Sequence, residues 1–166
     1  QTASLNLETS MTIAGDFTVI STGTGTLRLL NSTTARTMTV GGNYSQTSGT
    51  FNLKNSSGVA ILNVAGNFNQ SGGTFTLRSG STTGSGTVTV AKNFNLSAGT
   101  FNLSSIGAVG TLNVGGDFSH TGGTITETST GSGAIIFTSG LHTNISGGTV
   151  ANTINFTVTN GAALMM

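Results

Sequence analysis

The stretch LNVAGNFNQSGGTFTL, residues 62–77, contains two blocks in which apolar residues alternate with Asn or Thr. The first block runs from Leu62 to Phe68, and the second from Thr74 to Leu77. An alternation with a period of two places the apolar side chains on one face of a strand and the polar side chains on the other. Gly72-Gly73 stands between the blocks, where the chain can take a positive φ and turn. The stretch therefore predicts two short strands, each with one buried face.

Copies of this unit recur along the chain. Their opening apolar positions are 27, 24, 26, 24 and 24 residues apart: Met11, Met38, Leu62, Val88, Leu112 and, as a degenerate sixth, Ile136. A unit of about 24 residues cannot bury its own apolar side, whereas stacked units bury it together. The sequence therefore predicts an all-β fold, a parallel β-solenoid (β-helix) of about six coils. The competing fold, an up-and-down β-barrel or sandwich, gives less reason to repeat an Asn-Phe or Asp-Phe pair in every unit. Right-handed winding is the default for parallel crossovers.

We expect three parts along the chain. Residues 1–10 form a partial coil or strand, residues 11–134 form five solenoid repeats, and residues 135–166 form a degenerate terminal coil. Like side chains then stack on like in inward columns about 4.8 Å apart. The expected columns are Met38, Leu62, Val88 and Leu112; Val40, Val64, Val90 and Val114; Tyr44, Phe68, Phe94 and Phe118; Phe51, Phe75, Phe101 and Ile125; and Leu53, Leu77 and Leu103.

The composition excludes several classes of function. Thr 32, Gly 26, Ser 20 and Asn 16 make up 94 of the 166 residues, and charged residues only 5%. With no Cys, the chain has no disulfide, thiolate metal site or cysteine nucleophile. Five basic and four acidic residues leave a net charge of +1, too little to attract nucleic acid or anionic lipid. No apolar run approaches the roughly 20 residues of a membrane span. We therefore expect no nucleic-acid partner and no membrane insertion.

The few acidic residues and histidines are too scattered to predict a catalytic or metal site. Asp16 and Asp117 share one position of the repeat and would lie about 19 Å apart at about 4.8 Å per coil. Paired carboxylates that cleave glycosides lie about 5 to 9.5 Å apart, and a calcium site needs several clustered carboxylates. His120 replaces Gln or Leu of three other copies, which suggests a tolerant surface position. We predict no enzyme activity and no cofactor, and we interpret the repeated Asn or Asp before each aromatic residue as a turn ladder.

A column of threonines is the candidate binding surface. Thr begins the second block in five successive coils, and the residue two positions later is expected to point outward beside it. The candidate face comprises Thr26, Thr50, Asn52, Thr74, Thr76, Thr100, Asn102, Thr124 and Thr126, with Arg28 interrupting it. A flat array of Thr and Asn on a rigid face suits binding of ice or glycan. The alternative is an ordinary solvated strand face, where Thr has good propensity and cross-strand Thr pairs stabilise the sheet.

Glu127 breaks one inward column. It falls where Leu53, Leu77 and Leu103 point into the core. Because a buried unpaired carboxylate is costly, we expect the strand to end at Thr126 and Glu127 to turn outward.

Neither end of the repeat array has a capping unit in the sequence. Leu5 and Leu7 match the second block of a coil, and the apolar stretch 162–166 has no polar cap. An open solenoid end exposes unpaired backbone and core side chains that invite edge pairing. We expect either continuation in a longer chain or copies joined end to end, with an open coil or a donated strand of one copy sealing the next. Such a contact does not close on itself and yields a filament.

The units at residues 62–75 and 112–124 resemble repeats in large secreted surface proteins of gliding, type IX-secreting bacteria. The closing segment, residues 145–158, is similar to what often follows such repeats there. The resemblance covers about residues 11–160. It implies export and a surface or adhesin role, and it assigns no catalytic or ligand residue. We therefore expect a structural segment of an exported surface filament or adhesin, whose partners are copies of itself or adjoining repeats. A module that binds ice or glycan is the alternative.

Overall fold

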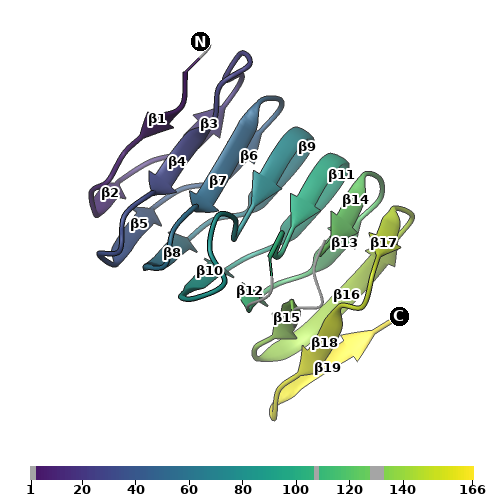
Figure 1. Ribbon diagram of the computed structural model, residues 1–166. Coiled ribbons are helices and arrows are strands. Elements are labelled where there is room, and N and C mark those ends of the chain that lie inside the picture. Colours follow the sequence, from purple (N-terminus) through teal and green to yellow (C-terminus); the bar gives the residue numbers. More distant parts are fainter. Residues whose placement is uncertain (1–2, 107–108, 128–132) are drawn as a thin grey trace.

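A computed structural model describes residues 3–106, 109–127 and 133–166. These residues contain no helix, and their strands stack as a β-solenoid of about six turns with a repeat of about 24 residues (Figure 1). Every strand pair is parallel, and each strand pairs with its equivalent one turn on. The predicted fold is confirmed.

One strand of each turn belongs to a seven-stranded sheet, which we call the first sheet. Its members are β2 (Met11–Ile13), β5 (Arg36–Val40), β8 (Val59–Val64), β10 (Ser85–Val90), β12 (Gly110–Val114), β15 (Ala134–Phe137) and β18 (Asn155–Val158).

The remaining strands form a second sheet of twelve strands that bends around a corner of the solenoid. In β9 and β11 the two arms of the bend are one continuous strand, and in other turns they are separate. The members are β1 (Leu5–Asn6), β3 (Phe17–Val19), β4 (Leu27–Leu30), β6 (Tyr44–Gln46), β7 (Thr50–Lys54), β9 (Phe68–Thr76), β11 (Phe94–Asn102), β13 (Phe118–His120), β14 (Thr124–Thr126), β16 (Gly140–Ser146), β17 (Thr149–Ala151) and β19 (Ala162–Met165).

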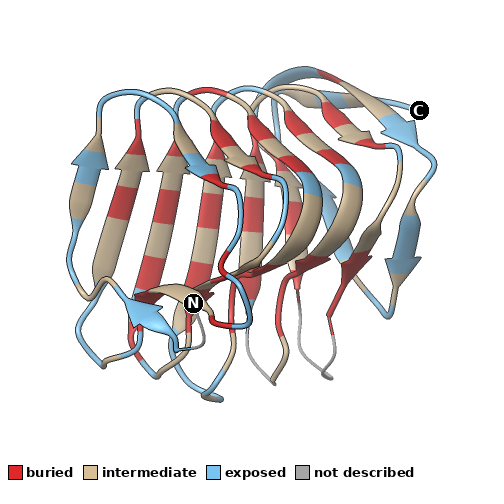
Figure 2. Cartoon of the chain, turned by 90° about the horizontal axis from the view of Figure 1, so that it is seen from above, coloured by how far each residue is buried: buried red, intermediate tan, exposed pale blue. Residues whose placement is uncertain are grey.

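All five predicted inward columns are buried, with side chains no more than 3% exposed. Buried and half-buried residues alternate along the strands, while exposed residues gather in the loops and at the two ends (Figure 2). One position differs from the prediction. Leu112 pairs with Ile135, so Ile135 rather than Ile136 continues the opening column, and Phe156 follows it. The spacing at that turn is one residue shorter than the sequence pattern indicated.

Two aromatic columns fill the centre of the solenoid. Within one column the rings stack: the ring centroids of Tyr44 and Phe68 are 4.6 Å apart, and those of Phe68 and Phe94 are 5.2 Å apart. Between columns they meet edge to face, as Phe68 and Phe75 do at 5.2 Å and 84°. Stacked and edge-to-face arrangements are both favoured by the ring quadrupole. Repetition of the unit thus produces a continuous aromatic core.

The repeated Asn or Asp before each aromatic residue forms the predicted turn ladder. The Asn43 side-chain oxygen accepts the backbone N–H of Asn67 at 2.9 Å, and Asn67 does the same for Asn93 at 3.1 Å. Asn93 accepts the N–H of Asp117 at 2.9 Å, and Asp117 accepts that of Thr143 at 2.8 Å. Each side chain therefore satisfies a backbone donor in the next coil, where the strands have ended and the ladder of the sheet cannot do so.

Glycine is required at the bend of the second sheet. Gly49, Gly73, Gly99 and Gly123 occupy one position in successive coils, with φ between 71° and 86°. A Cβ at Gly99 would lie 2.7 Å from the backbone carbonyl carbon of Gly72 in the preceding coil. The left-handed conformation and the close approach both exclude a side chain here. The bend therefore recurs at the same place in these four coils.

The prediction for Glu127 is half right. Strand β14 ends at Thr126 as expected, but Glu127 does not turn outward, because its side chain is only 1% exposed. The backbone N–H of Gly133 donates to its carboxylate, and a Cβ at Gly133 would collide with that carboxylate. A glycine directly before strand β15 makes room for the carboxylate and supplies its hydrogen bond, which offsets part of the desolvation cost.

The buried rings predict a large effect of truncation. Phe68→Ala should lower the free energy of unfolding by about 3–5 kcal/mol, because it removes a fully buried ring and leaves a cavity. Chemical denaturation measures the change, and Ser45→Ala, at a half-buried outward position of β6, serves as the control. A loss below about 1 kcal/mol for Phe68→Ala, the size of surface effects, would contradict a close-packed aromatic column.

Candidate functional site

The predicted threonine column lies on one arm of the second sheet. Thr50 pairs with Thr74, Thr74 with Thr100, and Thr100 with Thr124, and the column continues to Thr149. The side chains from Thr26 to Thr124 are half-buried, and Thr149 is exposed. The structure therefore brings the first residues of the candidate face together in one straight row.

The second half of that face is not a surface. Thr76, Asn102 and Thr126 are no more than 9% exposed, whereas Asn52 is half-buried. Thr126 also contacts the next coil, where the Asn152 amide donates to its hydroxyl at 3.0 Å. From Thr74 onward the expected two-column array is therefore a single column.

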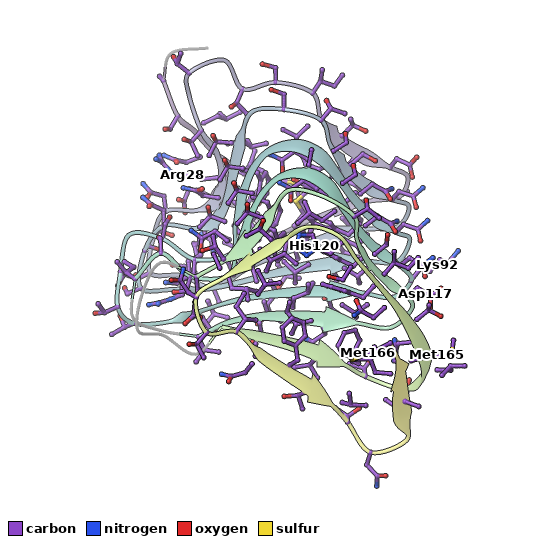
Figure 3. All side chains as sticks on the ribbon, turned by 90° about the vertical axis from the view of Figure 1, so that its right-hand side faces the viewer. Arg28, Lys92, Asp117, His120, Met165 and Met166 are labelled. Atoms are coloured by element: carbon purple, nitrogen blue, oxygen red, sulfur yellow. The ribbon has the colours of Figure 1, made fainter. Side chains whose placement is uncertain are left out.

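His120 is buried rather than on a tolerant surface position, and the prediction for it is wrong. It is 1% exposed and lies inside the solenoid (Figure 3). The amide of Gln70, at the equivalent position, donates to the carbonyl of Gly73 at 3.2 Å, and His120 Nε2 lies 3.3 Å from the carbonyl of Gly123. Burial lowers the pKa of His120, and the contact with the Gly123 carbonyl opposes that shift. The signal was in the sequence: His120 stands two residues after Phe118, so it shares the inward face.

A second buried histidine lies near the end of the solenoid. His142 is fully buried, and its Nδ1 lies 2.5 Å from the carbonyl oxygen of Gly116. Its Nε2 has no hydrogen-bond partner among the described residues. The ring centroids of His142 and Phe137 are 5.3 Å apart. Because Nδ1 contacts a backbone carbonyl and the ring packs against Phe137, His142 contributes to the packing of the terminal coils.

Two stacked cations are buried at another corner, and the sequence patterns did not predict them. Lys54 and Arg78 occupy equivalent positions in successive coils, and both are 0% exposed. The Lys54 ammonium donates to the carbonyl of Thr83 at 2.8 Å, and the Arg78 guanidinium donates to the carbonyls of Thr83 at 3.0 Å and Ile106 at 2.5 Å. No carboxylate of the described residues pairs with either cation. Backbone carbonyls of the corner loops take the place of counter-ions, so the pair anchors these loops.

The acidic residues remain apart, as the repeat spacing predicted. Asp16 and Asp117 lie in one column at the turn, and their carboxylates accept backbone N–H groups of the following coil. Among the described residues, no group of three or more His, Asp or Glu side chains could hold a metal ion. In the same residues, no helix is long and apolar enough to cross a membrane. The carboxylates of Asp16 and Asp117 thus each link one coil to the next.

Comparison of the chain with models of protein families, with curated proteins and with solved structures gave no match.

The buried cation pair predicts an unusual dependence of stability on pH. Burial, together with the neighbouring charge of Arg78, lowers the pKa of Lys54 from 10.5 to about 8. Between these two values the unfolded chain binds more protons at Lys54 than the folded chain, so the free energy of unfolding rises with pH. Well below pH 8 Lys54 is protonated in both states, so the cost of burying its charge is fully present and the free energy of unfolding no longer changes with pH through this group.

Urea denaturation at a series of pH values checks this, with Lys54→Met as the comparison. The stability of the wild type relative to Lys54→Met should rise between about pH 8 and pH 9.5. Burial raises the pKa of Tyr44 well above its ordinary value of 10.0, so ionisation of Tyr44 in the unfolded chain lowers the free energy of unfolding at higher pH. The pH series therefore ends below that range. Parallel curves for the two proteins would show that Lys54 titrates normally.

Proposed function

We propose that the chain is a structural segment of an exported surface filament or adhesin, located outside the cell or at its surface. Its working element is the rigid solenoid, which joins copies of itself or adjoining repeats of a longer chain through its end coils. The observation that carries the proposal is the continuity of the inward columns into both terminal coils. The resemblance of the repeats to surface proteins of gliding bacteria supports the export and the surface role.

In both terminal coils, the residues that continue the inward columns are partly exposed. At one end, the half-buried Met11 and Ile13 of β2 pair with Met38 and Val40. At the other, Phe156 and Val158 of β18 continue the same two columns and are 47% and 44% exposed. Stacking β2 of one copy on β18 of the next would therefore extend both columns with apolar side chains and add a parallel strand pair.

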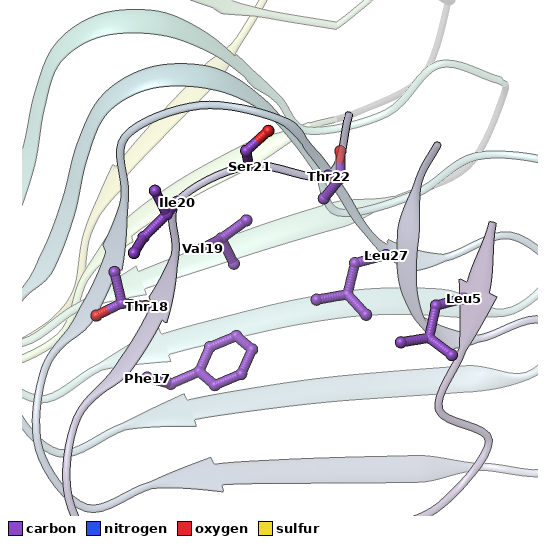
Figure 4. Close-up of a pocket in the computed structure, with 8 residues that line it drawn as sticks. All are labelled: Leu5, Phe17, Thr18, Val19, Ile20, Ser21, Thr22 and Leu27. Atoms are coloured by element: carbon purple, nitrogen blue, oxygen red, sulfur yellow. The ribbon is translucent and has the colours of Figure 1, made fainter. Parts of the chain in front are cut away.

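Each terminal coil also has an apolar hollow. At the N-terminal end a pocket of about 350 Å³ is lined by Leu5, Phe17, Val19 and Leu27 with polar neighbours (Figure 4). At the C-terminal end a pocket of about 330 Å³ is lined by Phe137, Asn144, Phe156, Leu164 and Met166. Met165 and Met166 lie on the end of the solenoid that faces the viewer in Figure 3. Apolar side chains of a further coil would fill these hollows.

Charge does not oppose such stacking. The chain carries a net charge of +1, and residues 1–37 contain two acidic residues, Glu8 and Asp16, and two basic residues, Arg28 and Arg36. Repulsion between stacked copies is therefore small, and the contact should depend on apolar burial and strand pairing rather than on ion pairs. The proposal involves no catalysis and no cofactor.

Assembly through the ends predicts rods that lengthen with protein concentration and persist at high salt. Negative-stain images and sedimentation velocity measure their length. Phe156→Asp should shorten the rods, because it places a carboxylate in the apolar contact. Thr157→Asp, on the outward face of the same strand, is the matched control and should leave them unchanged. A wild-type chain that stays monomeric at about millimolar concentration, where even weak contacts associate, would rule out end-to-end joining of copies.

A further inference from the structure

The outward face of the first sheet carries two adjacent columns that are polar except at Ile61, which we call the Thr/Asn grid. Each of β5, β8, β10 and β12 contributes two outward-pointing residues, one to each column. The members are Thr37, Ile61, Thr87 and Thr111, and Thr39, Asn63, Thr89 and Asn113. All eight side chains are half-buried, and they alternate with fully buried residues of the inward columns. Both columns of the grid are therefore partly open to solvent, whereas in the second sheet Thr76, Asn102 and Thr126, beside the threonine column, are buried.

The grid is regular in both directions. The pairing of β5 with β8, β8 with β10 and β10 with β12 proceeds without any shift of register. The second sheet is less regular, since β9 and β11 shift between Leu96 and Thr100. Parallel strands lie about 4.8 Å apart, and alternate residues along a strand lie about 6.6 Å apart. The grid thus places side chains at the points of a lattice that repeats over four coils.

Five of the eight grid residues are Thr, which carries both a methyl and a hydroxyl group, and the other three are Asn63, Asn113 and Ile61. Thr is β-branched and has few χ1 choices in a strand, so its hydroxyl is held in place at small entropic cost. The Asn113 amide donates to the Thr89 hydroxyl at 3.3 Å, which ties neighbouring members of one column together. None of the nine charged residues of the chain belongs to the grid. The surface is therefore rigid and uncharged, and it mixes polar hydroxyl and amide groups with apolar methyl groups.

We propose that the Thr/Asn grid binds ice. A regular array of fixed hydroxyl and amide groups can hold water molecules at positions that repeat from coil to coil, as attachment to an ordered ice surface requires, and the methyl groups leave the spaces between them uncharged. The chemistry of the grid fits other partners less well. It has no cation for phosphate or nucleic acid. It also has no aromatic residue, Met or Arg, the residues that mark the cores of protein interfaces. This activity does not depend on assembly through the ends, because the grid lies along the side of the solenoid.

Thermal hysteresis and the shape of growing ice crystals test the proposal with the purified chain. The wild type should lower the freezing point below the melting point and facet the crystals. Thr87→Lys, near the centre of the grid, should abolish both effects, because a charged side chain of greater length disrupts the lattice. Ser119→Lys, at a half-buried outward position of β13 in the second sheet, is the matched control and should retain both effects.

Circular dichroism establishes that both variants keep the wild-type fold, so that a loss reports the grid and not unfolding. Wild-type protein without hysteresis or crystal faceting at about millimolar concentration would overturn the proposal, as would equal losses in the two variants. Failure of rod formation in the experiment on Phe156 would leave this result unaffected. The two proposals can therefore be told apart.

Discussion

In-register parallel pairing between equivalent residues of successive coils is the constraint on which the structure depends. Each strand of the first sheet from β5 to β12 hydrogen-bonds to the same residues of its neighbours without a shift. This pairing stacks like side chains on like, so each position of the repeat has the same environment in successive coils. Apolar residues then form continuous columns inside, and the Asn side chains form a ladder of hydrogen bonds at the turn. A change at one column position therefore affects two neighbouring coils.

The same constraint explains why buried polar groups are tolerated here. Gln70, Arg78 and Glu127 are almost fully buried, yet each bonds to backbone of an adjacent coil or of its own corner loop. A corner of a solenoid leaves backbone carbonyls and N–H groups that the strand ladder does not use, and these groups pair with the buried side chains. The buried polar residues thus fix the corners, while the aromatic columns hold the centre.

Both proposals place function on surfaces of the solenoid. The ends present apolar columns that suit stacking on further coils, and the side of the first sheet presents a regular uncharged grid. Both features arise from repetition of one unit of about 24 residues. A solenoid that repeats one coil presents the same weak contact many times. Many weak contacts together can bind an extended partner without any strong single site.

The sequence alone determined the repeat, the strand type, the five inward columns and the turn ladder, because each depends on alternation and spacing that every coil repeats. Only the tertiary structure decided the places where the repeat changes. Ile135 rather than Ile136 enters the core because pairing with Leu112 selects the register. Glu127 stays inside because Gly133, six residues later, leaves room and donates its N–H. Thr126 is buried beside Asn152, whose amide donates to its hydroxyl, and Lys54 is buried where the carbonyl of Thr83 takes the place of a counter-ion. These outcomes depend on contacts between residues of different loops, which a pattern of spacing along one strand does not contain.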